Sequence, residues 1–193
     1  MNAQRLALAL GALAGAALVH CSPTDVVVAD LPPHHDGGDP DHRCLNDDDC
    51  HGDGFCARTA CDDITGQCAA RPVFCDPARS PTCGCDGVTY WNDCLRQLNG
   101  VTASTDGQCG VGAATCGGAI GPCPVTGASC ARSYPSQTRC AKEEPGICWV
   151  LPQTCPTGDT ELYVLCYSAT CGDACTVIRS EQPFRPLGGA TCQ

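Results

Sequence analysis

The stretch CDPARSPTCGCDGVTYWNDCLRQLNGVTASTDGQC, residues 75–109, carries the clearest local structural signals in the chain. Asp86-Gly87 is a turn signal of the kind that joins short strands. Val88 to Tyr90 follow, with the β-branched and aromatic residues that suit a strand. A second short strand is expected over residues 101–103.

The middle of the same stretch predicts a helix. Asn92 or Asp93 can accept a hydrogen bond from the first turn of a helix over residues 94–98. Asn99-Gly100 then ends that helix. We therefore expect one helix packed on a small sheet, with cysteines joining the two.

Cysteines dominate the composition. The chain has 193 residues, of which 21 are Cys and only nine are aromatic, namely two Trp, four Tyr and three Phe. Such a chain cannot build a conventional apolar core, whereas each disulfide of a small secreted domain contributes about 2–4 kcal/mol. Zinc is the alternative use of so many cysteines, but no CxxC pair is present. The sequence therefore predicts a small disulfide-rich fold with little regular secondary structure.

The cysteines after Cys21 divide into two sets of ten, over residues 44–109 and 116–193. GQCAARPVFC from Gly66 is echoed by GICWVLPQTC from Gly146, which favours a diverged tandem duplication over a chance alignment. Residues 110–115, GVGAAT, have the composition of a linker. We therefore expect two Cys-rich modules.

Nine positions of the opening stretch resemble, in order, the core of the Kazal family of serine protease inhibitors, in which Cys-Gly-x-Asp-Gly-x-Thr-Tyr-x-Asn-x-Cys precedes a final cysteine. They are Cys83, Gly84, Asp86, Gly87, Thr89, Tyr90, Asn92, Cys94 and Cys109. Cys85, at the third core position, resembles a bacterial branch in which a Cys-rich stretch precedes the core. The resemblance covers residues 75–109 and implies that the first module ends in a Kazal-like helix on a short antiparallel sheet.

The resemblance also implies which residues face a protease. In the family, the residue two past the second cysteine enters the protease specificity pocket, and the core asparagine braces the loop. The protease-facing loop would then be Asp76, Pro77, Ala78 and Arg79, with Pro77 at the pocket and Asn92 as the brace. Proline suits neither a trypsin-like pocket, which takes Arg or Lys, nor a chymotrypsin-like pocket.

Disulfide pairings follow from the resemblance as well. It implies that Cys75 pairs with Cys94 and that Cys83 pairs with Cys109. Cys85 is then expected to find a partner upstream, and Cys68 is our choice.

Residues 1–20 have the features of a signal peptide. Arg5 precedes an uncharged apolar run over residues 6–19, which is too short to span a membrane. Leu18-Val19-His20-Cys21 resembles the lipobox of bacterial lipoproteins, whose cysteine is lipidated. Lipidation of Cys21 leaves twenty cysteines, an even number that can all pair.

The expected location is extracytoplasmic, as an outer-membrane lipoprotein or a secreted protein. Ser22 favours the outer membrane by analogy with lipoproteins, and cleavage after Ala29 without a lipid is the alternative. Residues 21–43, rich in Pro, Gly, Asp and His, are expected to form a disordered tether.

The second module lacks the Kazal core. Its small apolar core is expected to comprise Trp149, Leu151, Leu162, Tyr163, Val164, Leu165, Tyr167, Val177 and Ile178. An exposed patch that binds a partner is the alternative.

We predict no catalytic residue, cofactor or metal ligand. All five histidines lie at or before His51, and no GxSxG, HExxH or phosphate-binding loop is present. Asp47, Asp48, Asp49 and Asp53 are expected to lie in a solvated loop, because Arg58 stands where an EF-hand needs its glutamate. A net charge of -10, with scattered basic residues, argues against nucleic acid as a partner.

Two functions are consistent with these features. The first is a serine protease inhibitor or protease-binding module at the cell surface. The second is a structural or adhesive module that binds another extracellular protein and has no inhibitory activity.

Overall fold

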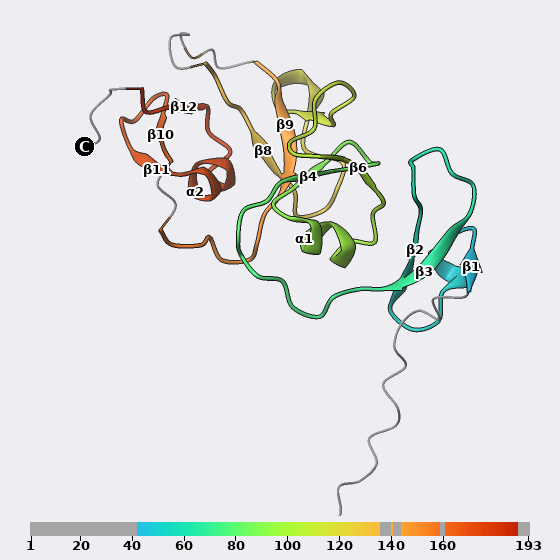
Figure 1. Cartoon of the computed structure of the whole chain (residues 1–193). Helices are drawn as coiled ribbons and strands as arrows, with labels where there is room; N and C mark the ends of the chain where they lie inside the picture. The colour runs from blue at the N-terminus through green and yellow to red at the C-terminus, as the bar shows by residue number, and fades with distance from the viewer. Residues whose placement is uncertain (1–41, 136–139, 141–143, 159–160, 189–193) are drawn as a thin grey trace, which may run out of the picture. The chain divides into compact units, whose positions relative to one another are not determined.

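The computed structural model describes residues 42–135, 140, 144–158 and 161–188. Within these ranges the chain forms twelve strands of two to five residues, two α-helices and two short 3-10 helices (Figure 1). This is more strand than we expected, because disulfides hold strands that are too short to be stable alone. In the described part of the chain, no helix has the length and apolar character needed to cross a membrane.

The expected signal peptide and Cys21 lie outside the described residues, as does most of the expected tether. The last residue of the expected tether, Arg43, is described and is structured. Arg43 belongs to the first strand and pairs with Gln67, so the folded part begins inside the segment that we expected to be disordered.

The first sheet has three strands in the order β1-β3-β2. They are β1 (Arg43–Cys44), β2 (Gly54–Ala57) and β3 (Gly66–Ala70). The acidic run between β1 and β2 forms the exposed 3-10 helix η1 (Asp47–Asp49). The Asn46 side chain caps this helix, and Asn46 N donates to Asp49 Oδ2 at 3.1 Å. Asn46 and Asp49 thus form a capping box where we expected a loop.

Residues 75–109 contain one helix and three antiparallel strands. The strands are β4 (Thr82–Gly84), β5 (Thr89–Tyr90) and β6 (Ala103–Asp106), with β4 in the middle. The helix α1 (Asp93–Leu98) begins one residue earlier than expected, because Asn92 is its cap. The last strand begins at Ala103, later than expected, because the Val101 N–H still closes the helix end on Arg96 O.

The second half contains two further groups of strands. The first group is β7 (Thr115–Cys116), β8 (Ser129–Ala131) and β9 (Gly146–Val150), with the 3-10 helix η2 (Gly118–Ile120) after β7. The second group is β10 (Leu162–Leu165), β11 (Cys171–Asp173) and β12 (Phe184–Pro186), with α2 (Ala174–Arg179) after β11.

The first group repeats the first sheet residue by residue. Cys44 lies opposite Gly66 and Cys56 opposite Cys68, just as Cys116 lies opposite Gly146 and Cys130 opposite Cys148. The disulfides also correspond, with Cys44–Cys56 and Cys50–Cys68 in one half and Cys116–Cys130 and Cys123–Cys148 in the other.

The second group repeats the Kazal-like unit, although its sequence motif is absent. The strand order β11-β10-β12 corresponds to β5-β4-β6, and both helices have six residues. The second residue of each helix, Cys94 or Cys175, is bonded to a cysteine five residues past the preceding central strand, Cys75 or Cys155. The structural correspondence between the halves therefore extends over both units of each half.

Residues 110–115 separate the disulfides of the two halves but do not separate the sheet. Every described disulfide has both cysteines on one side of this segment. However, β5 pairs in parallel with β9, and the Trp91 and Trp149 rings meet edge-on with centroids 6.2 Å apart. One core cluster therefore contains residues of both halves.

The expected core of the second half is partly wrong. Trp149, Val164, Val177 and Ile178 are buried, and Leu151, Tyr163 and Leu165 pack against the core. Leu162 and Tyr167 are exposed. Leu162 is exposed at the start of β10, where the strand begins, and Tyr167 lies in the turn after that strand.

Candidate functional site

The loop Asp76–Arg79 is exposed and joins the first sheet's last strand to β4. Cys75, immediately before it, is bonded to Cys94 in α1 with a Cα–Cα distance of 5.6 Å. This disulfide fixes the start of the loop to the helix. The four residues that the resemblance assigns to a protease-facing loop thus form one solvent-exposed segment held at its base.

Asn92 holds the backbone on both sides of Pro77. Its side-chain Nδ2 donates to the carbonyl oxygens of Asp76, at 2.8 Å, and Ala78, at 3.0 Å. Its Oδ1 accepts a hydrogen bond from Leu95 N at 2.9 Å, which caps α1. An amide is needed here, because only a group with both donor and acceptor atoms can brace the loop and cap the helix together.

Trp91 makes a contact that the sequence reasoning missed. Its side chain is fully buried, and the indole Nε1 donates to the carbonyl oxygen of Pro77 at 2.8 Å. Its own backbone oxygen accepts from Ser80 N at 3.0 Å. The tryptophan next to the core asparagine was the available signal, because buried Trp N–H groups find a partner.

Arg79 is the one basic residue of the loop, and its charge is already engaged. Its guanidinium lies over the Trp91 ring, 5.4 Å from the centroid, and its Nη1 is 3.1 Å from Glu161 Oε2. Asp76 is also turned inward on the loop, since its Oδ1 accepts from Ala78 N at 2.7 Å. The charged side chains of the loop therefore stabilise its conformation.

In the described part of the second half, Asp173 stands where Asn92 stands in the first half. Asp173 caps α2 by accepting from Thr176 N at 2.8 Å, as Asn92 caps α1. A carboxylate cannot donate to loop carbonyls, so this residue can act only as a cap. Gly172 stands at the position corresponding to Trp91. Neither Asp173 nor Gly172 can therefore make the contacts that Asn92 and Trp91 make with the loop around Pro77.

The structure pairs Cys75 with Cys94 and Cys83 with Cys109, the two pairs that the resemblance implies. The expected bond between Cys68 and Cys85 is wrong. Cys68 lies on β3 within the first sheet and is bonded to Cys50, with a Cα–Cα distance of 5.4 Å. Cys85 is bonded to Cys61.

Two hydrogen bonds to Thr102 explain why Cys85 is bonded to Cys61. The segment after β2 reaches the Kazal-like sheet, where Arg58 N donates to Thr102 Oγ1 at 3.2 Å and Cys85 N donates to Thr102 O at 2.9 Å. Thr102 therefore brings the segment that contains Cys61 next to Cys85. No local motif encodes this contact.

Two clusters of cysteine sulfurs have metal-like spacing. Their sulfur atoms lie within 4.8 Å of one another, in the groups Cys44, Cys50 and Cys68, and Cys116, Cys123 and Cys148. All six cysteines are in disulfides, so their sulfurs are not thiolates available as ligands. The clusters are pairs of adjacent disulfides.

The ionisable groups around α1 have structural roles. Tyr90 donates its hydroxyl to Asp86 Oδ2 at 2.7 Å; burial, and then this contact, raises the pKa of Tyr90. Desolvation alone would raise the pKa of Asp93. Hydrogen bonds from Arg96 Nε at 2.7 Å and Gln97 Nε2 at 2.6 Å outweigh it, so the pKa of Asp93 lies below its usual value.

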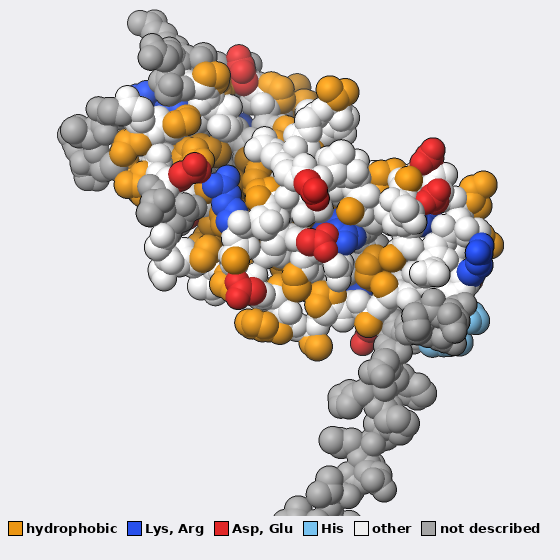
Figure 2. Space-filling model, in the orientation of Figure 1, with side chains coloured by type: hydrophobic (Ala, Val, Ile, Leu, Met, Phe, Trp, Pro, Cys, Tyr) orange, Lys and Arg blue, Asp and Glu red, His pale blue; other side chains and the backbone are white. Residues whose placement is uncertain are grey.

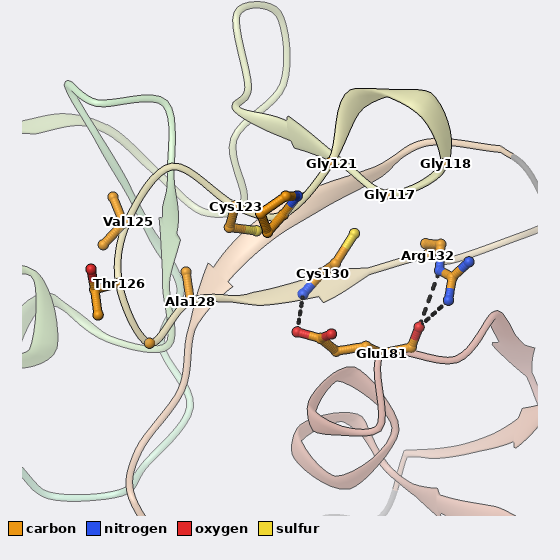
Figure 3. A pocket seen from close by; sticks show the side chains of 12 residues that line it. Gly117, Gly118, Gly121, Cys123, Val125, Thr126, Ala128, Cys130, Arg132 and Glu181 are labelled. Carbon is orange, nitrogen blue, oxygen red and sulfur yellow. Dashed lines mark hydrogen bonds between the residues drawn. The ribbon is translucent and has the colours of Figure 1, made fainter.

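A cavity of about 530 Å³ lies next to η2 and β8 (Figure 3). Glu181 Oε1 accepts from Cys130 N at 3.3 Å at its edge, and Arg132 donates to the Glu181 carbonyl oxygen. At the corresponding place in the first half, Cys56 N donates to Asp47 Oδ1 at 2.9 Å. Gly117, Gly118 and Gly121 line the cavity in the second half.

No protein-family model matches the sequence, and no curated protein matches it either. The structure itself shows a small disulfide-rich protein with nine disulfides among the described residues. Disulfides form and persist in oxidising compartments, so this content indicates an extracytoplasmic location.

Proposed function

We propose that this protein is an exported, non-enzymatic, Kazal-like module that binds a serine protease through the loop Asp76–Arg79. One observation carries the proposal, namely that Asn92 Nδ2 bridges the Asp76 and Ala78 carbonyls across Pro77. A loop held in one conformation loses little entropy on binding, and after cleavage its two ends would stay together. Both properties favour inhibition of the protease over cleavage and release of the loop as a substrate.

The location proposed for this activity is the cell surface. Lipidation of Cys21 would anchor the mature chain in the outer membrane, and the segment between Cys21 and β1 would carry the folded part away from the lipid. A secreted form without the lipid is the alternative, with the same loop and the same partner.

A second function is favoured by a different observation. To react in a serine protease, the carbonyl of the pocket residue must enter the oxyanion hole. Pro77 O instead accepts from Trp91 Nε1, and Arg79 is held by Glu161 and the Trp91 ring. These contacts favour a structural or adhesive module that binds an extracellular protein without inhibiting a protease.

Substitutions at Pro77 and Trp91 separate the two functions. The oxidised full chain with Cys21→Ser, which removes the lipid site, is assayed against trypsin, chymotrypsin and subtilisin. Proline at the pocket position limits the wild-type protein, so Pro77→Arg should create or strengthen trypsin inhibition. Adding Trp91→Phe to Pro77→Arg keeps an aromatic ring and frees the Pro77 carbonyl, so inhibition should increase further.

The readouts are the inhibition constant and the cleavage rate between residues 77 and 78. Binding of at least one protease by the wild-type chain, without rapid cleavage, supports the proposed function. The proposed function would be rejected, in favour of the structural or adhesive module, if the Cys21→Ser chain and both of its Pro77→Arg variants neither bind nor slow any of these proteases.

A further inference from the structure

Two histidines, His42 and His51, meet at the surface beside the first sheet, and we call them the histidine pair. Their ring centroids are 5.8 Å apart and the ring planes are inclined by 48°. Both residues are exposed, and Figure 2 shows histidine side chains, in pale blue, gathered at one place on the drawn face. His42 belongs to the segment that we expected to be a tether, and His51 follows the acidic run, so the sequence did not predict their contact.

The backbone of both histidines is held by the same residue, Cys68 of β3. Cys68 N donates to the His42 carbonyl oxygen at 3.1 Å. His51 directly follows Cys50, which is bonded to Cys68 with a Cα–Cα distance of 5.4 Å. A ligand shared by the two imidazoles would therefore find them already close together, which lowers the entropy lost on binding.

The spacing of the histidine pair suits one metal ion bound by both rings. Zn–N bonds are about 2 Å long, which puts the centroids of two imidazoles on one tetrahedral ion roughly 5 Å apart. The observed separation of 5.8 Å is close to this value, and rotation of two exposed side chains can close the difference. Imidazole nitrogen is a preferred ligand of zinc and copper ions, whereas calcium and magnesium ions prefer oxygen.

The surroundings of the histidine pair are negatively charged. The helix η1, between the two histidines in sequence, consists of three aspartates. Hydrogen bonds from Leu45 N and Asn46 N lower the pKa of Asp49, and the nearby charge of His42 adds to this effect. Asp49 is therefore an ionised carboxylate near His42, and its charge favours a cation over an anion as the shared ligand.

We propose that His42 and His51 form a binding site for one divalent transition-metal ion of the zinc or copper class, with water at the remaining coordination positions. The ion would join the chain just before β1 to the loop before β2. Because only the folded chain brings the two rings together, the ion would stabilise the folded state. Such a site differs from our expectation that the chain has no metal ligand, and it does not depend on the loop Asp76–Arg79.

Calorimetric titration of Zn²⁺ into the full oxidised chain tests this site. The parent chain carries Cys21→Ser and no histidine tag, and the buffer is free of chelators at neutral pH. The variants are His42→Ala and His51→Ala. The matched control is the double substitution His34→Ala and His35→Ala, which removes two other histidines of the chain, outside the described residues.

Two checks accompany the titration. A thiol assay on the oxidised protein shows that no free cysteine is present to bind zinc. Circular dichroism shows that each variant folds, and His42→Gln or His51→Gln, which keeps a polar side chain, replaces any alanine variant that does not.

We expect the parent chain to bind one Zn²⁺ ion, and each substitution in the histidine pair to weaken binding by about tenfold or more, because one of two protein ligands is lost. The control should stay within about twofold of the parent chain. Zinc should also raise the thermal unfolding temperature of the parent chain and of the control more than that of the two variants. The proposal is overturned if the parent chain binds no Zn²⁺, if either variant of the pair binds as tightly as the parent chain, or if the control loses as much affinity as they do.

Discussion

At the scale of single residues, Asn92 joins the loop to the helix. The same amide accepts the Leu95 N–H and donates to two carbonyls of the loop. The two roles can be separated by one isosteric change, because aspartate keeps the acceptor and loses the donor. The second half already contains that change, since Asp173 caps α2.

Asn92→Asp should leave α1 capped and release the loop. Losing two hydrogen bonds, at about 1 kcal/mol each, should weaken the proposed protease binding by about 2 kcal/mol, or roughly 30-fold. The free energy of unfolding should change less than for Asn92→Ala, which also removes the cap. Calorimetric binding and denaturant unfolding measure the two quantities, and equal stability losses for both variants would contradict this division of roles.

Gly66 and its repeat Gly146 lie where strands approach closely. A Cβ on either would come within 2.5 Å of a carbonyl oxygen, that of Ala57 or Ala131. Gly66→Ala or Gly146→Ala should therefore destabilise the protein by roughly 1–3 kcal/mol, as overpacking does. Gly110→Ala, at a position with no atom within 4 Å, is the control and should change little in denaturant unfolding. A neutral Gly66→Ala would show that β2 and β3 lie further apart.

At the scale of elements, α1 is stabilised by the negative charge of Asp93 in its first turn. Asp93 is the first residue of the helix and accepts from Arg96, a buried side chain, and from Gln97. Asp93→Asn should cost about 1–3 kcal/mol, because Arg96 would keep its burial and lose its charged partner.

The pH dependence of this contribution has a definite sign. The pKa of Asp93 in the folded protein is below its ordinary value of 3.8, so the folded state favours the carboxylate. The stabilisation is complete above that value and is lost as the pH falls through the folded pKa. Denaturant unfolding from pH 6 to pH 2 should show the wild type losing its advantage over Asp93→Asn at the acidic end. A difference that is constant over this range would contradict the assignment.

Elements with local signals could be predicted from the sequence, and those fixed by distant contacts could not. Turn, cap and helix-end residues between Asp86 and Gly100 indicated β5 and α1, with boundaries shifted by about one residue. The strands β10 to β12 were not expected, because their segment has no motif. Their arrangement depends instead on the cap Asp173 and the Cys155–Cys175 bond.

The candidate site shows the same division. Asn92 and the loop residues follow from the motif, whereas the restraint on Arg79 comes from Glu161, 82 residues away. Cys61 and Cys85 meet because Thr102 receives a hydrogen bond from each of their segments. Neither contact can be predicted from cysteine spacing or from a local motif. The sequence therefore could not identify Cys61 as the partner of Cys85.

At the scale of the whole molecule, the two halves share a repeated arrangement of disulfides. Five disulfides of the first half and four of the second are described. Three correspond in order along the chain: Cys44–Cys56, Cys50–Cys68 and Cys75–Cys94 with Cys116–Cys130, Cys123–Cys148 and Cys155–Cys175. The halves differ at Cys61–Cys85 and Cys140–Cys166, where the later cysteine is eighth in one set and seventh in the other. The difference lies next to the central strands β4 and β10, since Cys85 directly follows β4 and Cys166 directly follows β10.

Mapping the disulfides of the oxidised protein by mass spectrometry of non-reduced peptides tests most directly that paired sulfurs build this fold. The account predicts that Cys61 is linked to Cys85, Cys68 to Cys50, and Cys75 to Cys94, with no bond between residues 44–109 and residues 116–193. Free thiols at these positions, a Cys68–Cys85 link or bonds between the two halves would contradict it.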